Sequence, residues 1–92
     1  MNEVFDDVWD ATEDTPAEAE NMKLRSSLMI AVQQHIKETG MSQKEAAKKF
    51  GVTQPRISDL MRGRINLFAI DSLVIMLATA GSKIEMQIRK VA

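Results

Sequence analysis

The stretch QKEAAKKFGVTQPRISDL, residues 43–60, decides the fold. It places a small residue, Ala47, four positions before Gly51, with apolar residues at the next, sixth and ninth positions after that glycine. These apolar residues are Val52, Ile57 and Leu60. A small residue lets two helices cross closely, and glycine accepts the left-handed backbone of a tight turn. The spacing therefore predicts two short helices held at a fixed angle, the helix-turn-helix arrangement.

Capping residues give the limits of these two helices. Ser42 and Glu45 have the spacing of a capping box at the start of the first helix. Thr53 can cap the second, which has Pro55 in its first turn. We expect this second helix over Gln54–Arg62.

Two further helices are expected around this unit. Thr15 and Pro16 are a strong helix start, and the helix should continue to about Thr39. Its predicted buried stripe recurs every four residues: Leu24, Leu28, Val32 and Ile36. After a loop, Arg64–Phe68, a fourth helix is expected over about Ala69–Ala80. Its inward residues are predicted to be Ile70, Leu73, Val74 and Leu77. The fold class is therefore all-α, with four to five helices, and the helix-turn-helix domain spans 15–82.

The C-terminal residues 83–92 have the alternation of a strand. Ile84, Met86 and Ile88 alternate with polar residues. A lone strand cannot satisfy its own backbone, so we expect it to pair antiparallel with the same strand of a second copy, giving a homodimer. The alternatives are a continuation of the fourth helix or a loose tail.

The near-neutral net charge hides two oppositely charged regions. Residues 1–21 contain eight acidic residues and no Lys or Arg, whereas residues 22–92 contain twelve basic and five acidic residues. The corresponding formal charges are −8 and +7. The basic region suits a phosphate backbone, and the acidic arm suits a basic partner.

The composition argues against other classes of protein. One His, no Cys, no Tyr and no phosphate-binding glycine loop make an enzyme improbable, and we expect no metal and no cofactor. The absence of Cys fits a reducing compartment such as the cytoplasm. No apolar run approaches the ~20 residues that span a bilayer, so no membrane association is expected.

The polar residues of the helix-turn-helix predict contacts with double-stranded DNA. Gln can bond bidentately to adenine and Arg to guanine. The predicted base-reading residues are Thr53, Gln54, Pro55, Arg56 and Asp59. The predicted phosphate contacts are Gln43, Lys44, Ser58, Arg62, Arg64 and Asn66. A protein-binding helical module is the rival interpretation.

Within the acidic region 1–21, residues 1–14 form the predicted acidic arm. This arm carries four apolar side chains that would share one face of a helix: Val4, Phe5, Val8 and Trp9. Apolar side chains among acids are typical of a segment that orders on a partner. The alternatives are a disordered tail and a tail folded back on its own domain.

MSQKEAAKKFGVTQPRISDLMRGR followed by FAIDSLVIMLATAG resembles the Xre/Cro-type helix-turn-helix family. With the preceding EDTPAEAENMKLRSSLM, the chain looks most like the HigA-type antitoxins of that family. The resemblance implies a lambda-repressor-like domain, dimeric binding to a palindromic operator, Gln54 and Arg56 as base readers, and Gln43 as a phosphate anchor. It also implies repression of its own operon and a small basic RelE-like toxin as partner. A stand-alone Xre-type regulator without a toxin is the alternative. Ala69 departs from the pattern, because relatives often carry a Ser or Thr cap there.

Overall fold

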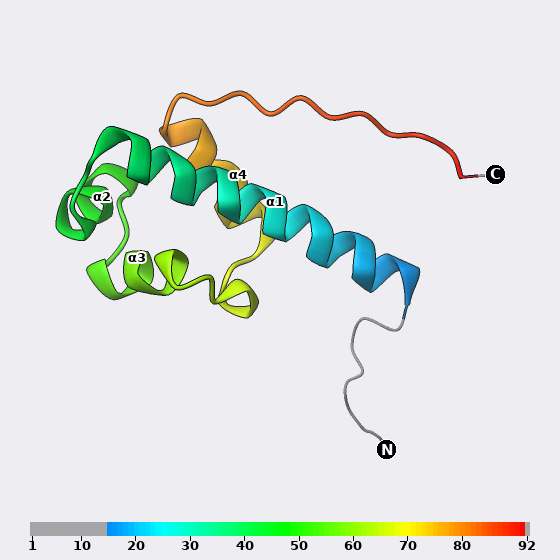
Figure 1. Cartoon of the computed structure of the whole chain (residues 1–92), viewed down its shortest axis with the longest axis horizontal. Helices are drawn as coiled ribbons and strands as arrows, with labels where there is room; N and C mark the ends of the chain where they lie inside the picture. The colour runs from blue at the N-terminus through cyan, green and yellow to red at the C-terminus, as the bar shows by residue number, and fades with distance from the viewer. Residues whose placement is uncertain (1–14, 92) are drawn as a thin grey trace, which may run out of the picture.

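A computed structural model describes residues 15–91. These residues form four α-helices and one 3-10 turn, shown in Figure 1. In chain order they are α1 (Pro16–Thr39), α2 (Gln43–Phe50), α3 (Gln54–Met61), the 3-10 turn η2 (Ile65–Leu67) and α4 (Ile70–Thr79). The expected all-α fold is confirmed, with four helices. None of the helices described is both long enough and apolar enough to cross a bilayer.

The long helix α1 begins and ends where its local sequence signals place it. The hydroxyl of Thr15 accepts a hydrogen bond from the backbone N–H of Glu18 at 3.0 Å, and Pro16 occupies the first helical position. Gly40 ends the helix in the left-handed conformation, with φ of 71°. A 24-residue helix therefore forms with a defined cap at each end.

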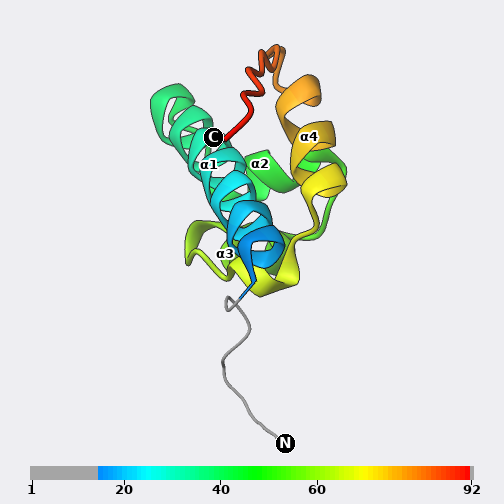
Figure 2. The same cartoon turned by 90° about the vertical axis from the view of Figure 1, so that its right-hand side faces the viewer.

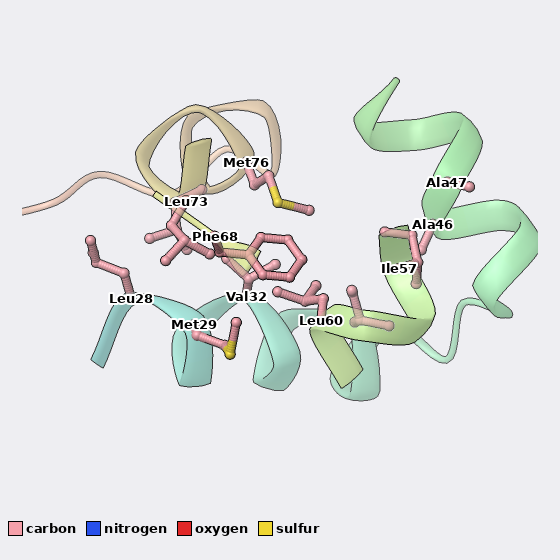
Figure 3. Close-up of a cluster of buried hydrophobic side chains, with 12 residues drawn as sticks. Leu28, Met29, Val32, Ala46, Ala47, Ile57, Leu60, Phe68, Leu73 and Met76 are labelled. Carbon is pink, nitrogen blue, oxygen red and sulfur yellow. The ribbon is translucent and has the colours of Figure 1, made fainter. Parts of the chain in front are cut away.

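The core lies between α1, α3 and α4. Helix α1 packs mainly along α4, and α2 packs against α3, as Figure 2 shows from the side. Figure 3 shows the Phe68 ring between these helices, close to Val32, Leu60 and Leu73. All four side chains are almost fully buried, and each contributes about 1.5–3 kcal/mol by leaving water. Phe68 comes from the linker between α3 and α4, residues 62–69, which contains η2. The linker itself is therefore part of the core.

The region from α3 to α4 differs in detail from the prediction. Helix α3 ends at Met61, one residue earlier than expected, and the expected loop contains the turn η2. Helix α4 begins at Ile70 after Ala69, which supplies no side-chain cap. Val74, predicted to face inward, is 37% exposed, and Met76 is buried instead. Met76 lies three residues after Leu73 on the same helix face, whereas Val74 is rotated away from it.

The prediction of a strand over 83–92 is wrong for the single chain. Helix α4 is followed by Gly81 with φ of 85°, and residues 82–91 form neither helix nor strand. In Figure 1 this segment leaves α4 and runs back beside α1. A strand needs a neighbour to accept its ladder of hydrogen bonds, and no other part of residues 15–91 is a strand. Ile84, Met86 and Ile88 remain 37%, 63% and 86% exposed.

Candidate nucleic-acid interface

The turn between α2 and α3 has the geometry that the spacing predicts. Gly51 has φ of 67°, and the N–H of Val52 returns to the carbonyl of Ala47 at 3.0 Å. Ala46 and Ala47 are both buried where α2 meets α3, and Ile57 on α3 is completely buried. Small side chains on α2 therefore let α3 lie close against it.

The first turn of α3 presents side chains to solvent. The hydroxyl of Thr53 accepts the backbone N–H of Arg56 at 3.3 Å, which caps the helix. Thr53, Gln54 and Pro55 are all exposed. The Gln54 amide makes no side-chain hydrogen bond within residues 15–91. Its two donors and one acceptor are thus available to a ligand.

The N-terminus of α2 offers a second exposed polar surface. Ser42 and Glu45 form the predicted capping box, with bonds of 3.1 Å to the Glu45 N–H and 2.9 Å to the Ser42 N–H. Gln43 and Lys44 follow in the first turn and are exposed. The box fixes the helix end, so these two side chains project from a defined position.

Arg56 does not project from α3 in the way the sequence suggests. Its guanidinium carbon lies 3.9 Å from the centroid of the Phe68 ring, and its Nη1 donates to the carbonyl of Leu67. The side chain is therefore half-buried against the linker before α4. A guanidinium over an aromatic face is attracted by the ring quadrupole, which stabilises this docked position.

Two side chains of α1 hold the end of α3 and the linker that follows it, and sequence reasoning missed both. Gln33 Nε2 donates to the carbonyl of Leu60 at 2.7 Å. Arg25 Nη1 donates to the carbonyl of Ile65 at 3.3 Å, and its Nε donates to Asn21 Oδ1 at 3.0 Å. Arg25, Met29 and Gln33 recur every four residues beside the apolar stripe, which is the signal that could have identified them.

The remaining predicted phosphate contacts lie on α3 and the linker. Arg62, Arg64 and Asn66 are exposed, and Ser58 is half-buried. Arg64 Nε lies 3.8 Å from Asp59 Oδ1, with side chains 53% and 31% exposed. Asp59, predicted to read a base, thus also faces a linker arginine. Helix α3 lies along the lower side of the molecule in Figure 1, and the linker that carries η2 continues from it.

The predicted partner-binding side chains Val4, Phe5, Val8 and Trp9 lie outside the described residues. The predicted dimer residues Ile84, Met86 and Ile88 belong to the segment that runs beside α1. Met86 and Ile88 line an open groove there together with Leu24 and Ala17 of α1. This groove is separate from the exposed turn of α3.

Comparisons with known proteins agree with the fold and the turn geometry. A family model described as "Helix-turn-helix domain" matches residues 11–89. A solved structure, named as that of a candidate XRE family transcriptional regulator, is 28% identical with a TM-score of 0.73. The match covers 80% of this chain and 83% of that chain. No curated protein matches the chain.

Proposed function

Because this chain belongs to the helix-turn-helix domain family, a family of DNA-binding domains and not of enzymes, we propose that it is a sequence-specific transcriptional repressor. The observation that carries the proposal is the capped first turn of α3. There Thr53, Gln54 and Pro55 stand exposed on a helix whose opposite face is fully buried. A rigid helix with free polar groups at its N-terminal end is suited to the major groove of DNA.

In this proposal α3 reads bases and its surroundings hold the phosphates. Gln54 bonds bidentately to an adenine, while Thr53 and Pro55 contact a thymine methyl group. The Asp59 carboxylate can accept a hydrogen bond from a cytosine amino group once the Arg64 side chain turns to the phosphate backbone of the DNA. Phosphate contacts come from both sides of α3. They are Gln43 and Lys44 on α2, Ser58 on α3, and Arg62, Arg64 and Asn66 after it.

The guanine contact predicted for Arg56 requires this side chain to leave its position in the free protein. The guanidinium would have to leave the Phe68 ring and the Leu67 carbonyl before it could reach a base. The exposed side chain of Gln54 can reach a base without breaking a side-chain hydrogen bond within residues 15–91. Gln54 is therefore the leading base reader of the proposal.

Binding of the full chain to the DNA upstream of its own gene, followed by fluorescence anisotropy, tests the proposal. We expect salt-sensitive binding with a preferred sequence. Gln54→Ala should lose about 1–3 kcal/mol of discrimination at one base pair. Gln34→Ala on α1 removes the same kind of exposed side chain away from α3 and should leave binding unchanged. Binding with no sequence preference would refute the proposal.

We further propose that the repressor is a homodimer joined through residues 83–92. The support is the alternating apolar set Ile84, Met86 and Ile88, which stays exposed in the single chain and would pair as a strand with the same segment of a second copy. Two-fold pairing would suit a palindromic operator with half-sites about 34 Å apart. Met86→Asp should give monomers in sedimentation, and Gln87→Asp on the alternate face should not. Dimers that survive Met86→Asp would place the interface elsewhere.

The finer proposal is the antitoxin role, with repression of its own operon. It rests on the resemblance to HigA-type antitoxins and on the acidic residues 1–21. A small basic RelE-like toxin would be bound through Val4, Phe5, Val8 and Trp9. Co-purification of such a protein, encoded by the neighbouring gene, with the full chain and with residues 15–92 tests this. Loss of toxin binding with DNA binding retained is expected for the shorter chain, and equal binding by both would contradict the role of the arm.

A further inference from the structure

The contacts of Arg56 set it apart from the other polar residues of α3. Phe68 is 1% exposed, and the Arg56 guanidinium stacks on its ring at 3.9 Å. Figure 3 places that ring at the centre of the core, between α1, α3 and α4. The guanidinium therefore lies directly over a core side chain, whereas Gln54 beside it is free in solvent.

Releasing Arg56 toward a base would undo two interactions at once. The Leu67 carbonyl would lose its charged donor, and such charge-assisted bonds are stronger than neutral ones. The outer face of the Phe68 ring would lose its cation. Any base contact must exceed both losses before it adds affinity. These two losses oppose the release of Arg56 in a DNA complex as they do in the free protein.

The docked side chain also completes a set of contacts to the linker. Three carbonyls between the end of α3 and the end of η2 accept from long polar side chains. Leu60, in the last turn of α3, accepts from Gln33, whereas Ile65 and Leu67 of the linker accept from Arg25 and Arg56. The first two donors come from α1, and Arg56 alone comes from α3. Arg56 therefore fixes the far end of the linker relative to the reading helix itself.

We propose that Arg56 is a positioning residue: it stays docked on Phe68 and Leu67 and holds the linker so that Arg62, Arg64 and Asn66 meet the phosphates beside the bases that Gln54 reads. The inference rests on the proposed DNA binding and concerns how that same surface is organised. Groups held in advance lose little freedom on binding, which raises affinity without a new contact. This role and the guanine contact predicted from the sequence give opposite results in one experiment.

The experiment compares Arg56→Met and Phe68→Leu in the full chain. Arg56→Met keeps the apolar stem but removes the charge, and Phe68→Leu keeps the arginine but removes the ring. Affinity is measured for the operator and a panel of single base-pair changes, at several salt concentrations and at a temperature where circular dichroism shows each variant folded. Leu28→Ala is the control, because it empties a buried position of α1 that lies outside α3 and the linker in the sequence.

For a positioning role, both variants should weaken binding to every DNA of the panel by a similar factor, on the order of tenfold. The salt slope is the steepness with which the logarithm of the binding constant falls with the logarithm of the salt concentration. It should decrease by more than the ~0.9 expected for one phosphate contact, because several linker contacts are lost together. The double variant should be no weaker than either single variant, because both act through one contact. Leu28→Ala should lower the melting temperature with affinity and slope unchanged.

Two other results would overturn the proposal. If Arg56→Met relaxes the preference at one base pair while Phe68→Leu retains it, Arg56 reads a base. If Arg56→Met behaves as Leu28→Ala does, the contact only stabilises the fold. If Phe68→Leu does not fold, the base panel and salt slope of Arg56→Met still separate these cases. A wild-type chain without sequence-preferring binding would instead contradict the proposed function itself.

Discussion

Replacing Gly51 by alanine tests the reason for a glycine in the turn between α2 and α3. The backbone there has φ of 67°, and no atom lies within 4 Å of the position that a Cβ would take. Alanine therefore meets no steric barrier, and only the left-handed backbone opposes it, at about 1–2 kcal/mol. Alanine also reduces the freedom of the unfolded chain, which offsets about 0.4–1 kcal/mol. We expect a net loss of about 1 kcal/mol in the free energy of unfolding.

Urea titration and thermal melting measure this loss. A change of about 1 kcal/mol lowers the melting temperature of a domain this size by about 4–8 °C. Gly40→Ala is the matched control: φ is 71°, and again no atom lies within 4 Å, but this glycine ends α1 outside the helix-turn-helix. Both variants should lose similar stability and keep wild-type DNA affinity when folded. A loss above about 3 kcal/mol at Gly51 alone would refute this reasoning, because it would show that space and not backbone conformation demands glycine.

Three other substitutions probe separate parts of the structure. Ser42→Ala removes the cap of α2 and should lower the free energy of unfolding by about 1 kcal/mol in urea titration; no loss would mean that the capping box is not stabilising. Leu60→Ala empties a fully buried position and should lose about 2–5 kcal/mol, and calorimetry showing under 1 kcal/mol would contradict its central place in the core. Arg64→Ala should change stability by less than about 1 kcal/mol, because its pair with Asp59 is exposed. The same variant should reduce the salt slope of DNA binding by about 0.9, and an unchanged slope would remove Arg64 from the phosphate contacts.

Features that depend on neighbouring residues could be predicted from the sequence. The caps at Thr15, Ser42 and Thr53 each act within one helical turn, so their signals lie next to the helices they start. The left-handed turn at Gly51 is local in the same way. The helix-turn-helix was therefore predictable, and with it the exposure of Gln54.

Features that depend on distant residues could not be predicted in the same way. Arg56 was expected to face outward because its near neighbours on α3 are polar, but its position is decided by Phe68, twelve residues along the chain. Val74 and Met76 are both apolar, and only the packing of α4 on α1 decides which one is buried. The alternating pattern over 83–92 predicted a strand, but a strand needs a neighbouring strand, and residues 82–91 form none in the single chain.

The uneven burial along α1 has a consequence for hydrogen exchange. Its fully buried residues run from Leu28 to Ile36, whereas the first turns after Pro16 have no fully buried side chain. Amide protons near Val32 should therefore exchange only by global unfolding, and those near Glu20 through local opening at far smaller free energy. The N-terminal turns of α1 can therefore open while the buried side chains from Leu28 to Ile36 stay packed.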